Sequence, residues 1–331
     1  MAEEFDFSVK PYMKDGKPVV VPALPRKVNP YTKDGKPIVA KMPHYNGDYM
    51  PFTIRALVEA LGGLDKTMKP GDTVILKPNF NCTFATPLST DLTYLTSIIE
   101  ILQDYGLKVV VAEMCGRAAW PTETVIEKLE VLPALKRYGV PFVNLFHDEW
   151  VEVDINGKYW QKIHVPRTMY EADHRIYAAN MRTHSAGRYS CTIKLSVGWI
   201  SPEDREIMHS DRNLSEKMIA ENNLAFQPDL VFVDGRRSTI EFAGRGPYVH
   251  PNVVMASGDM VAVDTEAVKI LKTYPAENRL QVPMDEIYQI TTAAEHKLGF
   301  TDYEVINIPG HEWTEEQDNR DPATIAARGL R

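Results

Sequence analysis

Short, continuous apolar runs alternate with segments of helical period over most of the chain. The stretch DTVILKP at 72–78 reads as a buried strand, TDLTYLTSIIEILQDYG at 90–106 as a helix capped by Thr90 or Asp91, and LKVVVAEM at 107–114 as another buried strand. Strands that are apolar throughout are typical of parallel sheets that helices cover on both faces. We therefore predict an α/β fold that is doubly wound, with a mostly parallel or mixed sheet and helices on both faces.

The N-terminal region contains a near-duplication. The segments YMKDGKPVVV at 12–21 and YTKDGKPIVA at 31–40 both place an Asp-Gly turn before a β-branched run, which predicts an extended β-arm with two hairpin-like repeats. Such an arm packs across the body, packs onto a second subunit of a homo-oligomer, or covers the site as a lid. The predicted divisions are the arm over 1–48, an α/β catalytic core over 49–310 that is one unit or two lobes (49–150 and 151–310), and a peripheral tail over 311–331.

Composition and charge exclude several classes of partner. A net charge of −8 with no basic stripe excludes a nucleic-acid partner. The N-terminus MAEEFDFSVKP has no basic or apolar signal region, and no run approaches the roughly 18 apolar residues that a membrane helix needs. Three cysteines without a CxxC motif are too few for a disulfide framework. We expect a cytoplasmic protein with no membrane partner.

Polar and charged side chains follow four apolar runs at the points where the predicted strands end. In open α/β sheets these carboxyl ends meet at one edge, where ligands bind. The residues that follow TVIL, VVVA, RIYAA and LVFV include Lys77, Asn79, Glu113, Asn180, Arg182, Thr183, His184, Asp234, Arg236 and Arg237. The cations that would line one wall are Lys77, Arg182, Arg188, Lys194, Arg236, Arg237 and Arg245. Because the planar fork of arginine suits carboxylates and phosphates, the predicted ligand is a small anion.

These residue types indicate proton transfer next to a carbonyl or carboxylate. His184 lies among cations in the sequence, which favours a neutral imidazole that can act as a general base near pH 7. Lys77 and Lys194 are the candidates for stabilising developing enolate charge. The predicted substrate-binding residues are Asn79, Arg182, Thr183, Arg188, Asp234, Arg236, Arg237 and Arg245. The sequence thus predicts an isomerase or lyase that acts on a carboxylate-bearing metabolite and requires no cofactor.

Two alternative functions use the same segments. Cys82, Cys115 and Cys191 each lie beside a site segment, and three converging thiolates could hold a metal or an iron-sulfur cluster, as in a hydratase or an oxidoreductase. Chance adjacency of interior cysteines explains the same spacing. The second alternative is a protein that binds an anion without catalysis.

The segment SGDMVAVDTEAVKI at 257–270 contains two aspartates with different predicted roles. We predict a helix that begins near Asp264, with this residue as the N-cap that accepts from free backbone amides. Asp259 then lies in the preceding turn, where it either caps, holds a cation, or orients Lys194 or an arginine.

The motifs and their order resemble the family catalogued as domain of unknown function 362, over roughly residues 70 to 275. The resemblance rests on VILKPN at 74–79, MRTHSAGRYSCTIKLSVGW at 181–199, PDLVFVDGRRSTIEFAGRGP at 228–247 and NVVMASGDMVAVDTEAVKIL at 252–271. The residues on the motif positions are Lys77, Asn79, Thr183, His184, Lys194, Asp234, Gly246, Pro247, Asp259 and Asp264. The resemblance implies no established reaction.

The chain departs from the family pattern in ways that bear on its chemistry. Arg182 replaces the usual lysine, Leu195 and Ser196 stand where an asparagine often follows the lysine, and Met260 stands where proline is common. Many relatives have a ferredoxin-like cysteine extension, which this sequence lacks. The resemblance therefore implies no electron transfer through such clusters.

Overall fold

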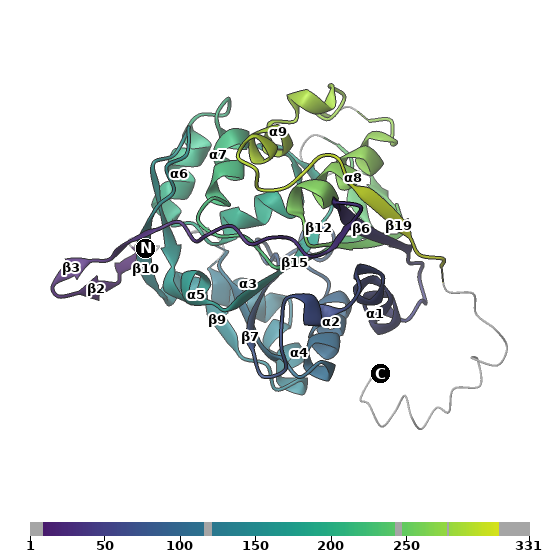
Figure 1. Cartoon of the computed structure of the whole chain (residues 1–331), viewed down its shortest axis with the longest axis horizontal. Helices are drawn as coiled ribbons and strands as arrows, with labels where there is room; N and C mark the ends of the chain where they lie inside the picture. Colours follow the sequence, from purple (N-terminus) through teal and green to yellow (C-terminus); the bar gives the residue numbers. More distant parts are fainter. Residues whose placement is uncertain (1–8, 116–120, 242–246, 277, 311–331) are drawn as a thin grey trace.

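The computed structural model describes residues 9–115, 121–241, 247–276 and 278–310. Its main element is a nine-stranded sheet with helices on both faces, which confirms the predicted doubly wound α/β fold (Figure 1). From one edge to the other, the strands are β19 (Glu304–Asn307), β6 (Lys36–Pro43), β18 (Val253–Ser257), β15 (Leu230–Gly235), β12 (His174–Asn180), β7 (Thr73–Lys77), β8 (Lys108–Glu113) and β9 (Phe142–Asn144). The short strand β5 (Thr32–Lys33) pairs with β6.

The sheet is mixed, but its larger part is parallel. The strands β15, β12, β7, β8 and β9 run parallel to one another. β18 runs against its neighbours β15 and β6, so β6 has the same direction as the parallel block, and the short β5 is antiparallel to β6. The carboxyl ends of β6, β15, β12, β7 and β8 therefore lie along one edge of the sheet.

Alternate residues of each strand enter opposite apolar cores. In β15, Val231 and Val233 belong to one buried cluster, and Leu230 and Phe232 belong to the other. The helices on the Leu230 side are α1 (Met50–Leu61), α2 (Leu92–Asp104), α3 (Thr122–Lys128) and α4 (Val131–Arg137). The helices on the Val231 side include α5 (Arg167–Glu171), α6 (Pro202–Ser210), α7 (Ser215–Asn222), α8 (Met260–Lys272) and α9 (Tyr288–Glu295).

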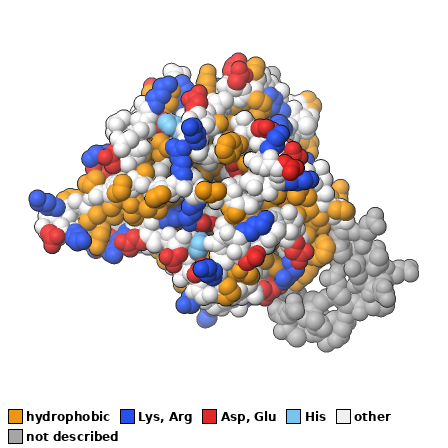
Figure 2. All heavy atoms as spheres, viewed as in Figure 1, with side chains coloured by type: hydrophobic (Ala, Val, Ile, Leu, Met, Phe, Trp, Pro, Cys, Tyr) orange, Lys and Arg blue, Asp and Glu red, His pale blue; other side chains and the backbone are white. Residues whose placement is uncertain are grey.

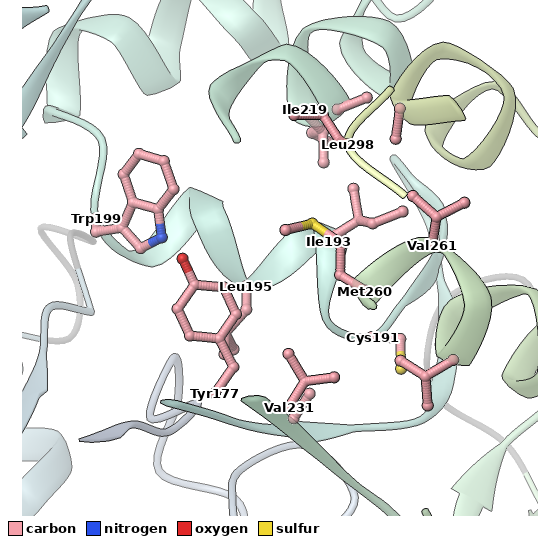
Figure 3. Packing of buried hydrophobic residues seen from close by; sticks show 14 of the residues in the cluster. Tyr177, Cys191, Ile193, Leu195, Trp199, Ile219, Val231, Met260, Val261 and Leu298 are labelled. Carbon is pink, nitrogen blue, oxygen red and sulfur yellow. The ribbon is translucent and has the colours of Figure 1, made fainter. Parts of the chain in front are cut away.

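A short 3-10 helix, η3 (Ile193–Gly198), lies between the sheet and these outer helices. Figure 3 shows Ile193 and Leu195 of η3 between Val231 of the sheet and Ile219 of α7. The remaining 3-10 helices of the described residues are η1 (Leu64–Lys66), η2 (Leu145–His147) and η4 (Met284–Glu286). Because the apolar residues of η3 are buried in the core, its polar residues are held at fixed positions at the carboxyl edge of the sheet.

The two N-terminal repeats occupy different parts of the structure. Both form the predicted Asp-Gly turn, with positive φ at both residues. In the first repeat, the hairpin of β2 (Met13–Lys14) and β3 (Lys17–Pro18) projects from the body (Figure 1). The flanking strands β1 (Lys10–Pro11) and β4 (Val20–Pro22) pair with β10 (Glu149–Asp154), which pairs in turn with β11 (Lys162–Pro166). In the second repeat, β6 lies between β18 and β19. Residues 36–43 therefore belong to the core sheet rather than to the arm.

Both halves of the predicted core contribute to the same sheet. β7 comes from the 49–150 half and pairs directly with β12 from the 151–310 half. The β10–β11 sheet packs into the same buried cluster as β15. On the face seen in Figure 2, basic and acidic side chains are interspersed. No helix within the described ranges is long and apolar enough to cross a membrane.

The prediction that Asp264 begins a helix is wrong. Helix α8 begins at Met260, and its N-cap is Asp259, whose carboxylate accepts from the backbone N–H groups of Val261 and Ala262. A third N–H, from Phe300, donates to the same carboxylate, so of the roles predicted for Asp259 the structure shows capping. Asp264 lies one turn into α8. The apolar residues that precede it, 260–263, already belong to the helix.

Asp264 is fully buried and ties the 180–199 segment to α8. Its carboxylate accepts from the N–H and hydroxyl of Thr192, from the N–H of Ile193 and from the hydroxyl of Tyr189. Burial raises the pKa of Asp264, and the hydrogen bonds from Thr192 oppose this shift. These four bonds fix the start of η3 against α8.

Candidate functional site

The site lies where the winding direction of the sheet reverses. The chain passes from β7 outward to β8 and β9, and then returns to the other side of β7 to form β12 and β15. Ligands of open α/β sheets bind at such a switch point, outside the carboxyl ends of the strands. Lys77 ends β7, Glu113 ends β8 and Asn180 ends β12, so all three lie at this edge, where Lys77 and Glu113 line a common cavity.

A buried ion pair between Lys77 and Glu113 forms the centre of the site. The ammonium Nζ of Lys77 lies 2.7 Å from Oε1 of Glu113 and donates to the carbonyl of Pro78 at 2.8 Å. Both side chains are almost completely excluded from solvent, at 1% and 2% exposure. Two backbone N–H groups, of Met114 and Phe80, also donate to the Glu113 carboxylate. These contacts hold the Glu113 side chain in place, and Glu113 in turn fixes the position of Lys77.

The environment of Lys77 shifts its proton affinity. Burial lowers the pKa of Lys77, the charge and hydrogen bond of Glu113 oppose that shift, and the positive charge of Arg205 lowers the pKa further. The neutral amine is therefore easier to reach than for a lysine in water. A lysine with a lowered pKa can give up its proton to a bound molecule more readily than a lysine in water.

A small cavity of about 40 Å³ opens onto this ion pair. Its lining residues are Lys77, Asn79, Asn81, Glu113, Met114, Arg182, Ser190, Lys194, Leu195, Val197, Gly198 and Arg205. One water molecule needs roughly 10–15 Å³ by this measure, so the cavity has room for a group the size of a carboxylate. The lining contains four cationic side chains and one carboxylate, which gives it a positive charge within an acidic protein.

Gly198 closes the cavity over the ion pair. A Cβ atom at this position would lie 2.6 Å from Nζ of Lys77 and 2.8 Å from Oε1 of Glu113. Only glycine allows the backbone to approach both atoms so closely. The glycine in KLSVGW, which the sequence analysis left without a role, is therefore part of the site.

Arg205 is a second residue of the site that sequence reasoning missed. It lies on α6, is 9% exposed, and donates from its Nη1 to the backbone carbonyl of Cys115 at 2.6 Å. In the sequence Arg205 follows no predicted strand, so the strand-end rule does not select it. Only the packing of α6 over the carboxyl edge brings it to Lys77.

The structure brings together four of the predicted site residues, Lys77, Asn79, Arg182 and Lys194. It places three others within or behind a hairpin of β13 (Arg182–His184) and β14 (Arg188–Ser190). The hydroxyl of Thr183 is buried and donates to the carbonyl of Glu241. Nδ1 of His184 accepts from the N–H groups of its own hairpin loop, at Ala186 and Gly187.

Arg188 is likewise used by the fold. It begins β14 at φ +59°, and its Nε donates to Oε1 of the buried Glu216 at 2.8 Å. Arg279 also contacts Glu216, at 3.2 Å. None of Thr183, His184 and Arg188 lines the Lys77 cavity.

Asp234, Arg236 and Arg237 lie further along the same edge, at the end of β15. Arg236 donates to both oxygens of Asp234 and to the carboxylate of Asp91, the N-cap of α2. The two arginines line a separate cavity of about 460 Å³, together with residues from the end of β6. Arg245, another predicted cation, lies outside the described residues.

The three cysteines do not form a metal site. Cys82, Cys115 and Cys191 are buried thiols outside any disulfide, and among the described residues no group of three or more His, Cys, Asp or Glu side chains is arranged to hold a metal ion. The thiol of Cys115 donates to the carbonyl of Asn81, whereas burial and the nearby Asp264 raise the pKa of Cys191. The alternative in which all three thiolates converge on a metal or cluster finds no support among the described residues, because Cys191 lies beside Asp264 of α8.

Comparison with known proteins identifies relatives of this chain. A thylakoid-associated protein of Synechocystis sp. is 24% identical over 263 residues, which cover 76% of this chain and 79% of the relative. The solved lactate racemase apoprotein of Thermoanaerobacterium thermosaccharolyticum is 13% identical with a TM-score of 0.44, and a Thermotoga maritima protein is 12% identical with a TM-score of 0.34. These alignments cover 76% and 74% of this chain but only 62% and 58% of the solved chains.

The family assignment rests on a match to a family model. The model of the family described as domain of unknown function DUF362 matches residues 74–269, which is more than half of the chain. This range contains the Lys77–Glu113 pair, the 180–199 segment, α6 and the start of α8. The chain therefore belongs to the DUF362 family.

Proposed function

We propose that this chain is an enzyme that acts on a small carboxylate-bearing metabolite by proton transfer next to a carbonyl or carboxylate, as an isomerase or a lyase. The observation that supports the proposal is the lining of the small cavity, in which four cations and one carboxylate surround space for a carboxylate-sized group. An anion that enters this cavity exchanges its hydration for charged hydrogen bonds, which are about twice as strong as neutral ones. The acidic character of the rest of the chain makes this cluster of cations stand out.

Binding and charge stabilisation fall to the cations around the pair. Arg182 and Arg205 enter from different elements, β13 and α6, and Lys194 enters from η3. Guanidinium groups suit the carboxylate of the substrate, because their paired N–H donors match its two oxygens. When a proton leaves the adjacent carbon, these groups also stabilise the negative charge that develops on the substrate oxygen.

Lys77 is the group that moves the proton. Its Nζ has two partners within the described residues, Glu113 and the Pro78 carbonyl, which leaves a third position at the cavity. As a neutral amine it accepts the proton from the carbon, and as an ammonium it returns that proton. If Lys77 returns the proton to the other face of the carbon, or to another atom, the product is an isomer. If the carbanion instead loses a leaving group, the product is that of a lyase. Glu113 acts as a positioning residue, since its oxygens are occupied by Lys77 and backbone N–H groups.

Hydrogen exchange at carbon tests this proposal without knowledge of the product. The full chain is incubated in D2O with a panel of small oxo, hydroxy and amino carboxylates, and loss of the signal of the hydrogen next to the carboxylate is followed by NMR. We expect exchange with at least one compound, and a reduction of about 100- to 10,000-fold for Lys77→Met. Lys69→Met, at an exposed lysine outside the cavity, is the matched control and retains exchange.

The alternative is an anion-binding protein without catalysis. Under that alternative, a carboxylate from the panel binds in a manner that depends on Arg182, but its carbon-bound hydrogen does not exchange. Exchange that is equally fast in the wild type and in Lys77→Met would contradict the role of Lys77.

A further inference from the structure

The cavity of about 460 Å³ at the end of β15 is distinct from the Lys77 cavity. It is bordered by the end of β6, by the N-terminal turns of α1 and α2, by the residues that follow β15, and by the segment after β17 (Tyr248–Val249). Its lining residues include His44, Thr93, Arg236, Arg237, His250 and Asn252. The two cavities have no lining residue in common. Its volume lies within the range of roughly 300–1,000 Å³ that is typical of small-molecule sites.

The two arginines of this cavity are used in different ways. Arg236 is committed to the fold, because Asp234 and Asp91 accept all of its recorded hydrogen bonds. The guanidinium of Arg237 stacks on the ring of Tyr248, with Cζ 3.6 Å from the ring centroid. Its Nε is buried without a hydrogen-bond partner, and Arg237 forms no ion pair with any residue that the structure describes.

The acidic residues near Arg237 are already occupied. Asp91 accepts from the N–H of Tyr94 and from Arg236, and Asp48 accepts from the N–H of Tyr45. His44 shares a hydrogen bond of 2.8 Å with Thr53, and burial, assisted by the charge of Arg236, lowers the pKa of His44. A neutral histidine leaves Arg237 as the cation available to a ligand.

We propose that this cavity is a second ligand site, which binds a small molecule through an oxyanion, either a carboxylate or a phosphate. Arg237 receives the oxyanion in its planar fork, and Tyr248 holds the guanidinium in place from below. The polar side chains of Thr93, His250 and Asn252 line the space for the rest of the ligand. Because the cavity is about ten times larger than the Lys77 cavity, it accommodates a whole metabolite rather than a single charged group.

Calorimetric titration of the full chain with inorganic phosphate and, separately, with succinate tests this site. We expect saturable binding of one probe, and the probe that binds identifies the oxyanion. Arg237→Gln should raise the Kd about 10- to 100-fold, the loss that removal of a charged hydrogen bond represents. Arg237→Lys, which keeps the charge but loses the fork, should also weaken binding. Arg212→Gln, at an exposed arginine outside the cavity, is the matched control and should bind as the wild type does.

Substitutions of Tyr248 separate its ring from its hydroxyl. Tyr248→Leu removes the surface on which Arg237 stacks and should raise the Kd, whereas Tyr248→Phe keeps the ring and should not. Because the side chain of Arg237 has no hydrogen bond to lose within the described structure, all of these variants are expected to fold, and their thermal midpoints provide the check.

The outcomes distinguish this proposal from that for the Lys77 cavity. If neither probe binds, or if Arg237→Gln and Arg212→Gln bind equally well, the second site is refuted. Binding that Lys77→Met abolishes and Arg237→Gln leaves unchanged would refute the second site while supporting the first. Loss of binding in Arg237→Gln together with normal binding in Lys77→Met supports the second site, whatever the result of the hydrogen exchange experiment.

Discussion

Two buried groups of charges in this protein are built in opposite ways. Around the Lys77 cavity, cations from four different elements surround a single carboxylate, Glu113. At the start of α8, two buried carboxylates, Asp259 and Asp264, form no ion pair with any described residue. Backbone N–H groups and hydroxyls satisfy these carboxylates instead.

The difference separates charged groups that the protein itself satisfies from charged groups that border open space. Each carboxylate at α8 receives at least three hydrogen bonds from the protein, and these bonds hold η3 and the loop before β19 in place. No cavity opens onto Asp264 among those found at the carboxyl edge. The cations near Lys77, in contrast, line a space with room for an anion. Asp264 borders none of the cavities of the described residues, so its burial points to a role in the fold, whereas Asp259 also borders a separate cavity of about 700 Å³.

The largest effect is expected for Glu113→Gln. This substitution leaves the ammonium of Lys77 buried without its carboxylate, and breaking a buried ion pair costs about 3–5 kcal/mol. Chemical denaturation at pH 7 measures the free energy of unfolding. Glu123→Gln is the control, because its pair with His147 is exposed and contributes less than about 1 kcal/mol. Equal losses in the two variants would show that Lys77 and Glu113 are not a buried pair.

A smaller effect, with a defined pH dependence, is expected at Asp259. Burial raises the pKa of Asp259 from 3.8 to about 6. Between these values the folded state binds a proton that the unfolded state does not, so stability falls as the pH rises. A shift of this size corresponds to about 3 kcal/mol, fully present below pH 3.8 and lost above pH 6.

Asp259→Asn removes the titrating group and should flatten this part of the curve. The comparison is the free energy of unfolding of both proteins between pH 3.5 and 7, roughly the interval that the shift defines. The amide loses the oxygen that accepts from the N–H of Phe300, so the variant should be less stable than the protonated wild type at pH 3.5, by about 1–2 kcal/mol. An unchanged slope in the variant would show that another group titrates in this range.

Gly198→Ala tests the close approach at the cavity. The added Cβ would lie 2.6 Å from Nζ of Lys77, so the ion pair or η3 must move, at a cost of about 1–3 kcal/mol. Hydrogen exchange at carbon should slow as well, because Lys77 is displaced. Gly310→Ala is the control, since its Cβ would meet only Pro43, at 3.2 Å. If both variants lose the same small stability and exchange is unaffected, Gly198 does not constrain Lys77.

The apolar periods of the sequence predicted much of the fold, and the predictions that were wrong have local causes. The runs at β7, β8, β12 and β15 predicted strands and their shared edge correctly, because strands buried on both faces need apolar residues throughout. The two KDGKP repeats gave the same local signal, yet only the second continues into a long strand. In the first, Pro22 ends the strand after three residues.

The sequence predicted only part of the site, because it shows which side chains are charged but not which residues they contact. The strand-end rule found Lys77, but it could not show that Glu216, far away in sequence, accepts from Arg188. The same holds for Arg236, which two aspartates engage. Arg205 was missed for the opposite reason, since it comes from a helix whose position depends on tertiary packing.

Tyr189→Phe is expected to have the smallest effect, and it tests the claim that the carboxylates at α8 serve the fold. It removes one of four hydrogen bonds to the Asp264 carboxylate, which should lower the free energy of unfolding by about 1 kcal/mol. Tyr248→Phe is the matched control, because the Tyr248 hydroxyl has no hydrogen bond recorded within the described residues, and its stability should stay within about 0.5 kcal/mol. Since Tyr189 does not line the Lys77 cavity, hydrogen exchange at carbon should be unchanged in Tyr189→Phe. A large loss of exchange with little loss of stability would mean that Asp264 and its donors belong to the reaction site after all.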